Sequence, residues 1–299
     1  MKNIKKYTYT LLLQVGFICC LTAQQTTLHV VTQTIQKEWF WRPNKLLIIN
    51  GENAIITVKN WDKNSIQVTA ETIAKHPQKS IAERDVKAQK IITEYSRKSL
   101  LLGNQLVLKK GMVKPESNLK ATFTIYAPTN CALRIKNRFG QIDIEGIKNT
   151  VSIESQFTKL KIKDVKGKIN LTSNFGDIIG EELMGEVTID ANRSDIQLDQ
   201  PSGNFKIKAK YGLVTILEDK NRQFDLDIQG NKANVIFIDP ALFAHNFQLA
   251  TEFGEINVPS ASAFKFIENS KQRKEAVLHK TGNTSQISVA LSYGDITFQ

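Results

Sequence analysis

The chain has 299 residues, with 40 lysines and arginines against 29 acidic residues, so its formal net charge is +11 at pH 7. Cleavage after residue 23 would leave Cys131 as the only cysteine, which excludes an intramolecular disulfide in the mature chain. The remainder of the chain is still long enough to bury a hydrophobic core without that crosslink.

Residues 1–23 have the layout of a secretory signal peptide: three lysines near the start, an apolar run over residues 11–21, and Ala23 before the expected cleavage point. A membrane anchor is a weaker interpretation, because the apolar run is shorter than the roughly 20 residues that span a bilayer. Cys19 and Cys20 lack the small preceding residue of a lipoprotein signal. We therefore predict export without lipidation, to the periplasm, the outer membrane or the extracellular space.

Strands are predicted over most of residues 26–72, where short aliphatic and β-branched runs are separated by turn-forming Asn-Gly and Asp-Lys-Asn sequences. The expected strands are residues 28–31, 46–49, 55–58 and 66–69. After an interruption, further strands are expected at residues 105–108 and 121–126.

Residues 80–98 form that interruption and predict one helix. Ser80 and Glu83 have the spacing of a capping box, and four apolar residues between positions 81 and 95 recur on one helical face. We expect the helix to cover an open end or side of the sheet, which would otherwise be exposed to edge-to-edge association.

From residue 137 to residue 216 the sequence repeats itself at a fixed interval. The aromatic position of each copy is held by Phe139, Phe157, Phe175, Arg193 and Tyr211, and in looser copies by Lys232, Phe253 and Tyr293. Apolar residues three and five positions later predict a strand with one buried face. A corner is expected ten positions after the aromatic residue, where Gly or Asn recurs, before a second alternating strand: these residues are Asn149, Gly167, Gly185, Gly203 and Asn221.

A fixed period of this length is typical of a solenoid. We predict an all-β, single-domain parallel β-solenoid over residues 24–299, with roughly ten coils of about 18 to 21 residues and one helix in its N-terminal half. Regular coils are expected over residues 133–228 and irregular ones over residues 229–299. The polar run from Glu268 to Glu275 is interpreted as an insertion loop, with or without a short helix.

Outward residues of neighbouring coils carry mixed charges, and Asp143 and Lys161 are expected side by side on adjacent coils. The basic excess lies elsewhere: residues 75–120 contain eleven lysines or arginines against four acids. This segment could contact an anionic surface, although a solvated basic face on a cap is the simpler interpretation. The candidate contact residues are Arg84, Lys87, Lys90, Arg97 and Lys98.

Catalysis and metal binding are disfavoured by the sequence. The four histidines have no metal-ligand spacing. Four acidic residues occupy equivalent outward positions, but paired carboxylates need a cleft for acid–base chemistry, and no cleft is predicted: they are Asp177, Asp195, Glu255 and Asp295. The aromatic column is more typical of a stacked corner ladder than of a sugar-binding platform. Trp39, Phe40 and Trp41 cannot all be buried on one strand face, so at least one should be exposed unless the helix covers it.

The segment INGENAIITVKNWDKNSIQV, residues 49–68, together with the YG-D-I pattern at Phe175 and Tyr293, resembles a bacterial envelope family named "putative adhesin", a domain of unknown function. A related group is the auto-transporter adhesin head, or GIN, domain. The resemblance covers residues 46–299 and implies a β-solenoid of the cell envelope. The sequence departs from the family pattern where Thr158, Ser194 and Ala233 replace the Gly after the aromatic position, so bent or interrupted coils are expected there.

These observations predict an exported structural or interaction module of the cell envelope, adhesin-like and without enzyme activity, cofactor or metal. The alternative is a polysaccharide-binding or polysaccharide-processing β-helix protein, and a third interpretation is a signalling or chaperone-like envelope factor. The partner could be an envelope glycan, an anionic lipid or another envelope protein. Nucleic acid is disfavoured by export and by the absence of stacking aromatics among the basic residues.

Overall fold

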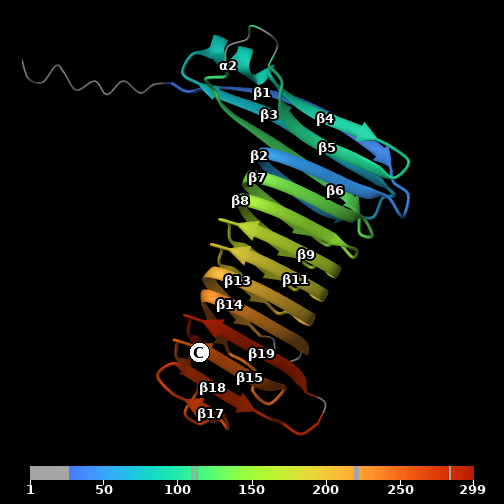
Figure 1. Ribbon diagram of the computed structural model, residues 1–299. Helices are drawn as coiled ribbons and strands as arrows, with labels where there is room; N and C mark the ends of the chain where they lie inside the picture. Colours follow the sequence, from blue (N-terminus) through green and yellow to red (C-terminus); the bar gives the residue numbers. More distant parts are fainter. Residues whose placement is uncertain (1–26, 109–110, 112–113, 219–221, 283) are drawn as a thin grey trace, which may run out of the picture.

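The computed structural model describes residues 27–108, 111, 114–218, 222–282 and 284–299. It is all-β, with 69% strand, and α2 (Lys79–Val86) is the one helix in the described residues. The prediction of an all-β chain with one helix is confirmed, whereas the predicted signal peptide, residues 1–23, lies outside the described residues. Figure 1 shows an elongated body that runs from the β1–β6 region at one end to the β15–β19 region at the other.

The twenty strands of the described residues belong to one sheet. They are β1 (His29–Phe40), β2 (Leu46–Trp61), β3 (Ser65–His76), β4 (Gln89–Tyr95), β5 (Ser99–Leu106), β6 (Asn118–Pro128), β7 (Ala132–Glu145), β8 (Val151–Lys163), β9 (Lys166–Asn174), β10 (Ile178–Glu181), β11 (Met184–Asn192), β12 (Ile196–Asp199), β13 (Ser202–Leu217), β14 (Phe224–Ile238), β15 (His245–Glu252), β16 (Ile256–Asn257), β17 (Lys265–Asn269), β18 (Arg273–Leu278), β19 (Ser285–Ser292) and β20 (Ile296–Phe298).

Strands of the middle region pair in parallel with partners one sequence repeat away. Val151 of β8 pairs with Ile169 of β9, which pairs with Val187 of β11, which pairs with Phe205 of β13. The short strands follow the same register, and Ile178 of β10 lies between its equivalents in β8 and β12. Each repeat therefore supplies two stretches of strand, which are separate elements in β9/β10 and β11/β12 and one continuous element in β7, β8, β13 and β14, and we call such a segment a layer. Alternate side chains of all layers point inward into one continuous hydrophobic cluster.

Most layers turn at two residues with left-handed backbone. The first is the aromatic position itself, where φ is 50° at Phe157 and 58° at Phe175. The second lies seven residues later, as at Glu182, where φ is 54°. The predicted corner at the Gly and Asn positions is only partly right: Gly167 and Gly185 have positive φ but lie inside a strand that has already turned, Asn149 has no positive φ, and Asn221 lies outside the described residues. The second turn follows the short strand directly, three residues before the predicted corner. Asp164, Glu182, Gln200 and Asp239 occupy it, and glycine occupies it only at Gly146 among the described layers.

The expectation of bent or interrupted layers at Thr158, Ser194 and Ala233 is wrong. These residues alternate along the body with glycines that pack against their carbonyl oxygens. A Cβ added at Gly176 would lie 2.1 Å from the Thr158 oxygen, and one at Gly212 would lie 2.4 Å from the Ser194 oxygen. A small side chain fits after the aromatic position in one layer because the equivalent residue of the next layer is glycine, so the strands stay in register.

The predicted helix over residues 80–98 is right only in its first half. α2 ends at Val86, and residues 89–95 form β4, which pairs antiparallel with β5. The residue before α2 is Gln78, which makes no side-chain cap, so the predicted capping box of Ser80 and Glu83 is absent. Two isoleucines and a threonine at positions 91–93 favour a strand, and β5 follows within a few residues as its partner.

The N-terminal strands extend the body beyond the first regular layer. β2 pairs in parallel with β7 on one side and with β5 and β6 on the other. β3 pairs antiparallel with β6, and β1 pairs antiparallel with β3. α2 packs on β1 and β3, where Ala82 and Val86 form a small buried cluster with Ala74. It therefore covers the face of this outer sheet, one of the positions that the sequence predicted.

At the other end, the final strands of the chain do not form the last layer. β19 and β20 pair with β14 on one side and with β15 and β16 on the other, so the C-terminal segment lies between two earlier segments. The polar run from Glu268 to Glu275, expected to form a loop or short helix, lies in the β17–β18 hairpin. β18 pairs antiparallel with β15 and covers its free edge.

Candidate functional site

The five basic residues singled out by the sequence fall into two groups. Arg84 belongs to α2, Lys87 follows that helix, and Lys90 lies in β4; all three line a hollow of about 590 Å³ that we call the helix hollow. Arg97 and Lys98 lie in the turn between β4 and β5 and line a separate hollow of about 740 Å³, which we call the turn hollow. The two groups are at opposite ends of β4, so the structure does not bring all five residues together.

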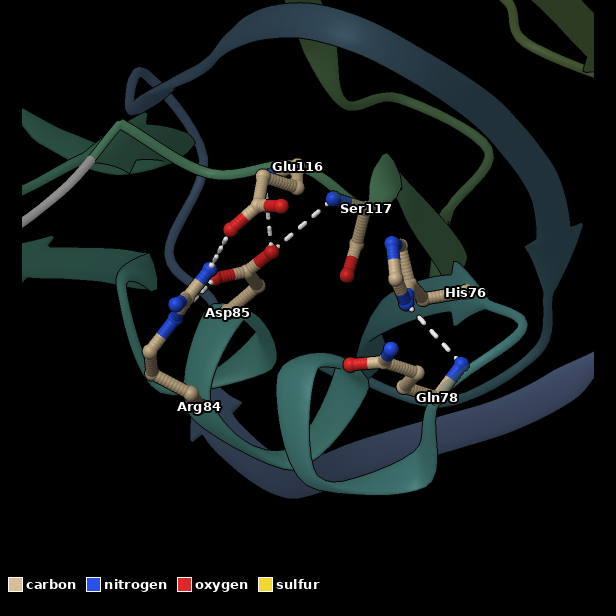
Figure 2. A network of polar contacts seen from close by, with 6 residues as sticks. All are labelled: His76, Gln78, Arg84, Asp85, Glu116 and Ser117. Atoms are coloured by element: carbon tan, nitrogen blue, oxygen red, sulfur yellow. Dashed lines mark hydrogen bonds and ion pairs between the residues drawn. The ribbon is translucent and has the colours of Figure 1, made fainter.

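Arg84 is engaged in a network with acidic residues. Its guanidinium donates to Asp85 at 2.8 Å and to Glu116 at 2.9 Å, as Figure 2 shows. The second oxygen of Asp85 accepts from the backbone N–H groups of Glu116 and Ser117 at 2.9 and 2.8 Å. Burial alone would raise the pKa of Asp85, but these hydrogen bonds outweigh it and lower the pKa to about 2. Arg84 therefore serves to hold residues 116–117 against the helix.

His76 closes the same region on the other side of α2. Its Nδ1 accepts from the backbone N–H of Gln78 at 3.0 Å, at the start of the helix (Figure 2). The helix hollow also contains the carboxylate of Glu83, which pairs with Lys79 at 3.7 Å. The helix hollow therefore has an acid in its lining and one cation, Arg84, that is already paired, while Lys87 and Lys90 form no ion pair among the described residues.

The turn hollow differs in its charges. It is formed by the β1–β2 turn and the β4–β5 turn, which are held together where the Leu46 N–H donates to the Lys98 carbonyl at 3.0 Å. Its lining includes four basic residues and no acid, namely Arg42, Lys45, Arg97 and Lys98. Within the part of the chain that the structure describes, none of these four forms an ion pair.

Two aromatic residues complete the turn hollow. Tyr95 and Phe40 are 46% and 64% exposed, and the Tyr95 hydroxyl donates to the Phe40 carbonyl at 2.8 Å. Lys45 lies 3.6 Å from the centre of the Tyr95 ring and donates to the Ser96 carbonyl at 2.7 Å. The sequence prediction for the Trp39–Trp41 segment is met by Phe40, because Trp41 is buried and Trp39 packs against the main core.

Arg42 and Lys45 were missed by the sequence reasoning. They lie far before Arg97 in the chain, outside the basic segment that the charge count selected, and strand pairing brings the two turns together. The available signal was the sequence WFWRPNK itself, which combines two cations with aromatic residues in a turn and contains no acid.

The aromatic column forms an exposed ladder along one corner of the body. Phe157 stacks on Phe139 at 5.1 Å between ring centres and on Phe175 at 4.8 Å. Arg193 continues the stack, with its guanidinium 5.2 Å from the Phe175 ring and 5.3 Å from the Tyr211 ring. The predicted stacked corner ladder is therefore present. Both faces of Phe157 and of Phe175 are covered by their neighbours in the stack, so only the edges of these rings reach solvent and a sugar has no free face there on which to stack.

The equivalent acidic residues act within the fold. Asp177 accepts from the Asp195 backbone N–H at 3.3 Å, and Asp195 accepts from that of Leu213 at 2.8 Å. Asp295 accepts from the Glu255 N–H at 2.8 Å. Each bond joins one layer to the next. Among the described residues, no group of three or more His, Cys, Asp or Glu is arranged to hold a metal ion.

The predicted neighbours Asp143 and Lys161 are paired in register, but their charges have other partners. Lys161 pairs with Glu181 at 3.3 Å, and Asp143 accepts from Gln141 at 2.9 Å. One further acid–base pair is internal: His245 contacts Glu218, and both side chains are buried. Several polar groups of the middle walls therefore bond within the fold.

Comparisons with known proteins give structures but no sequence family. No protein-family model and no curated protein matches the sequence. A putative cell adhesion protein from Clostridium sporogenes is 14% identical, with a TM-score of 0.26, over 89% of this chain and 99% of that one. Putative adhesins from Bacteroides fragilis and Parabacteroides distasonis are 11% and 10% identical, with TM-scores of 0.39 and 0.32, over 89% of this chain and 97% of theirs.

The single helix of the described residues, α2, is too short to cross a membrane.

Proposed function

We propose that the chain is an exported parallel β-solenoid that serves as an adhesin-like structural or interaction module of the cell envelope and has no enzyme activity. The observation that carries this proposal is the unequal use of charge. Basic residues of the middle layers lie on walls that also carry acids, and several polar groups there bond to neighbouring layers, whereas four basic residues without ion pairs gather around a hollow with no acid in its lining at one end. The stacked layers of β7 to β14, which we call the shaft, are suited to holding the basic turn hollow at a distance from the point where the protein is attached to the envelope.

The solenoid interpretation is supported by the parallel register of segments one repeat apart and by the shared left-handed corners. Stacked layers bury each other's faces, so no layer needs to be stable alone. The family resemblance of residues 46–299 agrees with this interpretation. Export is supported by the sequence of residues 1–23, which places the module where an envelope partner could be met.

Export can be tested with a fusion of residues 1–40 to alkaline phosphatase, which is active only outside the cytoplasm. We expect activity from the native fusion and none after Leu12→Arg and Leu13→Arg, which interrupt the apolar run. Protease treatment of intact cells then distinguishes surface from periplasm. Activity that is absent from the native fusion would contradict the proposal.

The alternative of a polysaccharide-binding or polysaccharide-processing protein is favoured by one observation, the exposed aromatic residues beside the basic residues in the turn hollow. Processing can be separated from binding by incubating the secreted protein with envelope polysaccharides and measuring new reducing ends and unsaturated products. We expect neither product. Sustained turnover that depends on a hollow residue would overturn the non-catalytic proposal.

A further inference from the structure

Lys45 is a buried cation without an acidic partner. Its residue is 8% exposed, and its ammonium contacts the Ser96 carbonyl and the Tyr95 ring, neither of which carries a negative charge. Burial of a charge is unfavourable unless an opposite charge compensates it. Glu38, an acid of the preceding strand, accepts a hydrogen bond from Ser65 instead. The hollow that Lys45 lines is therefore ready to accept an anion.

Other basic residues around Lys45 add to the positive charge of the hollow. Arg42, Arg97 and Lys98 line the same hollow, so four positive charges converge where the lining contains no acid. Arginine can bind a carboxylate or sulfate through two parallel N–H donors, and lysine adds a point charge. The backbone of the hollow is fixed by pairing of Leu46 with Ser99 and by the bond from Tyr95 to Phe40, so the charges are held close together before a ligand arrives.

The aromatic residues indicate a ligand with an apolar face as well as a charge. Phe40 is 64% exposed at the end of β1 and lines the hollow with Tyr95. Phe157 of the ladder is covered by a neighbouring ring on each face, whereas no ring is stacked on Phe40 among the described aromatic contacts. A sugar ring has an apolar C–H face and, when it is a uronate or a sulfated sugar, an acidic substituent at its edge.

The shape of the site argues against a flat anionic surface. The hollow is concave, with a volume of about 740 Å³, which is in the range of sites for small molecules rather than surfaces that lie on a bilayer. Lys45, the most deeply placed cation, is reached by a group that enters the hollow. A bilayer would meet the outer cations only.

We propose that the turn hollow binds an acidic sugar of a polysaccharide, with its carboxylate or sulfate held by Arg42, Lys45, Arg97 and Lys98 and its apolar face against Phe40. This proposal rests on the proposed function only in that the sugar is met outside the cell. It goes further in naming a ligand class, a site and the role of each residue.

The test is titration calorimetry of the secreted protein with galacturonate oligomers as the probe, at 50 and 150 mM salt. Wild-type protein should bind in a saturable way, and the methyl-esterified oligomer, which lacks the charge, should bind at least about tenfold more weakly. Arg97→Glu with Lys98→Glu should raise Kd by about tenfold or more.

The matched control is Lys87→Glu with Lys90→Glu, which makes the same charge change in the helix hollow and should alter Kd by less than about twofold. Phe40→Ala should raise Kd by about three- to tenfold without changing its salt dependence, because it removes a contact and no charge. Circular dichroism and thermal unfolding of each variant show that loss of binding is not loss of folding.

Four outcomes would overturn the proposal. These are no binding of the oligomers by wild-type protein, equal loss in both double variants, binding of the esterified oligomer as strong as that of the acid, or preference for phosphatidylglycerol vesicles over the oligomers. Each leaves the export assay unaffected, so failure of this site is distinguishable from failure of the proposed function.

Discussion

The middle layers and the N-terminal end of the molecule differ in whether acids lie beside their basic residues. In the layers of β8 to β13, Asp177 and Asp195 accept N–H groups of the next layer, and Lys161 and Lys163 pair with Glu181, so part of the polar surface helps to hold the layers together. At the N-terminal end, the turn hollow keeps four basic residues without ion pairs. The comparison teaches that a regular wall of mixed charge can contribute to holding layers together, while an irregular turn can gather cations with no acid beside them.

A substitution that interrupts the alternation of glycine with small residues at the corner should have the largest effect on the stability of the middle layers. Gly176→Val should destabilise the protein by about 4 kcal/mol or prevent folding, because its side chain would collide with the Thr158 carbonyl oxygen and cannot move away. Urea unfolding and secreted yield measure the effect. Lys159→Val, at an exposed strand position nearby, is the control and should change stability by less than about 0.5 kcal/mol. Wild-type stability of Gly176→Val would show that the alternation is not structural.

The Arg84–Asp85 network sharpens the comparison, because Arg84 lies at the N-terminal end but forms ion pairs within the fold, as Lys161 and Lys163 do in the middle layers. The pKa of Asp85 is lowered from 3.8 to about 2. Its folded state therefore binds fewer protons than the unfolded state between these values, so about 2 kcal/mol of stability is fully present above pH ~4 and is lost as the pH falls toward 2.

Asp85→Asn should remove about 2 to 3 kcal/mol at neutral pH and flatten the acid dependence of unfolding. Urea unfolding from pH 2 to pH 7 measures both. Glu83→Gln, which affects only an exposed pair with Lys79, should change stability by less than about 0.5 kcal/mol. An Asp85→Asn variant that keeps the acid dependence of the wild type would exclude this network as its source.

Two substitutions at Phe157 distinguish the stability that ring stacking contributes from the cost of the left-handed backbone. Phe157→Ala loses ring contacts on both faces and keeps a left-handed residue, so it should destabilise by about 1 to 2 kcal/mol. Phe157→Gly loses the same contacts but relieves the strained φ, and should be less destabilising than Ala. Thermal unfolding of the pair decides, and a Gly variant less stable than the Ala variant would contradict the assignment of strain to this position.

Arg193 gives the smallest effect, because an exposed cation–π contact is weak. Arg193→Ala should cost about 0.5 to 1 kcal/mol, since two ring faces lose their cover. Arg193→Phe should restore wild-type stability by completing the aromatic stack. If thermal unfolding finds Phe as destabilising as Ala, the guanidinium has a role beyond stacking.

The period of the middle layers could be read from the sequence because every copy buries the same positions. The second corner could not, since residues such as Glu182 adopt left-handed backbone without a Gly signal. The sequence predicts too long a helix, because the apolar spacing over residues 81–95 fits a helical face. The strand β4 depends on its pairing with β5, which a local sequence pattern does not show.

Only half of the basic residues of the turn hollow could be predicted from the sequence, for a related reason. Arg97 and Lys98 lie in the segment with the largest basic excess, so counting charges found them. Arg42 and Lys45 join them only because Leu46 pairs with Ser99, a residue far along the chain. Charge counting also selected Arg84, whose partner Glu116 becomes a neighbour only in the folded chain.

Hydrogen exchange of the secreted protein, with and without saturating galacturonate oligomers, tests most directly whether the shaft is structural and the N-terminal end binds. We expect slower exchange in peptides that cover residues 40–46 and 95–99, and unchanged exchange over residues 133–217. Slower exchange along the ladder residues of the middle layers, with none in the two turns, would contradict this division of the molecule.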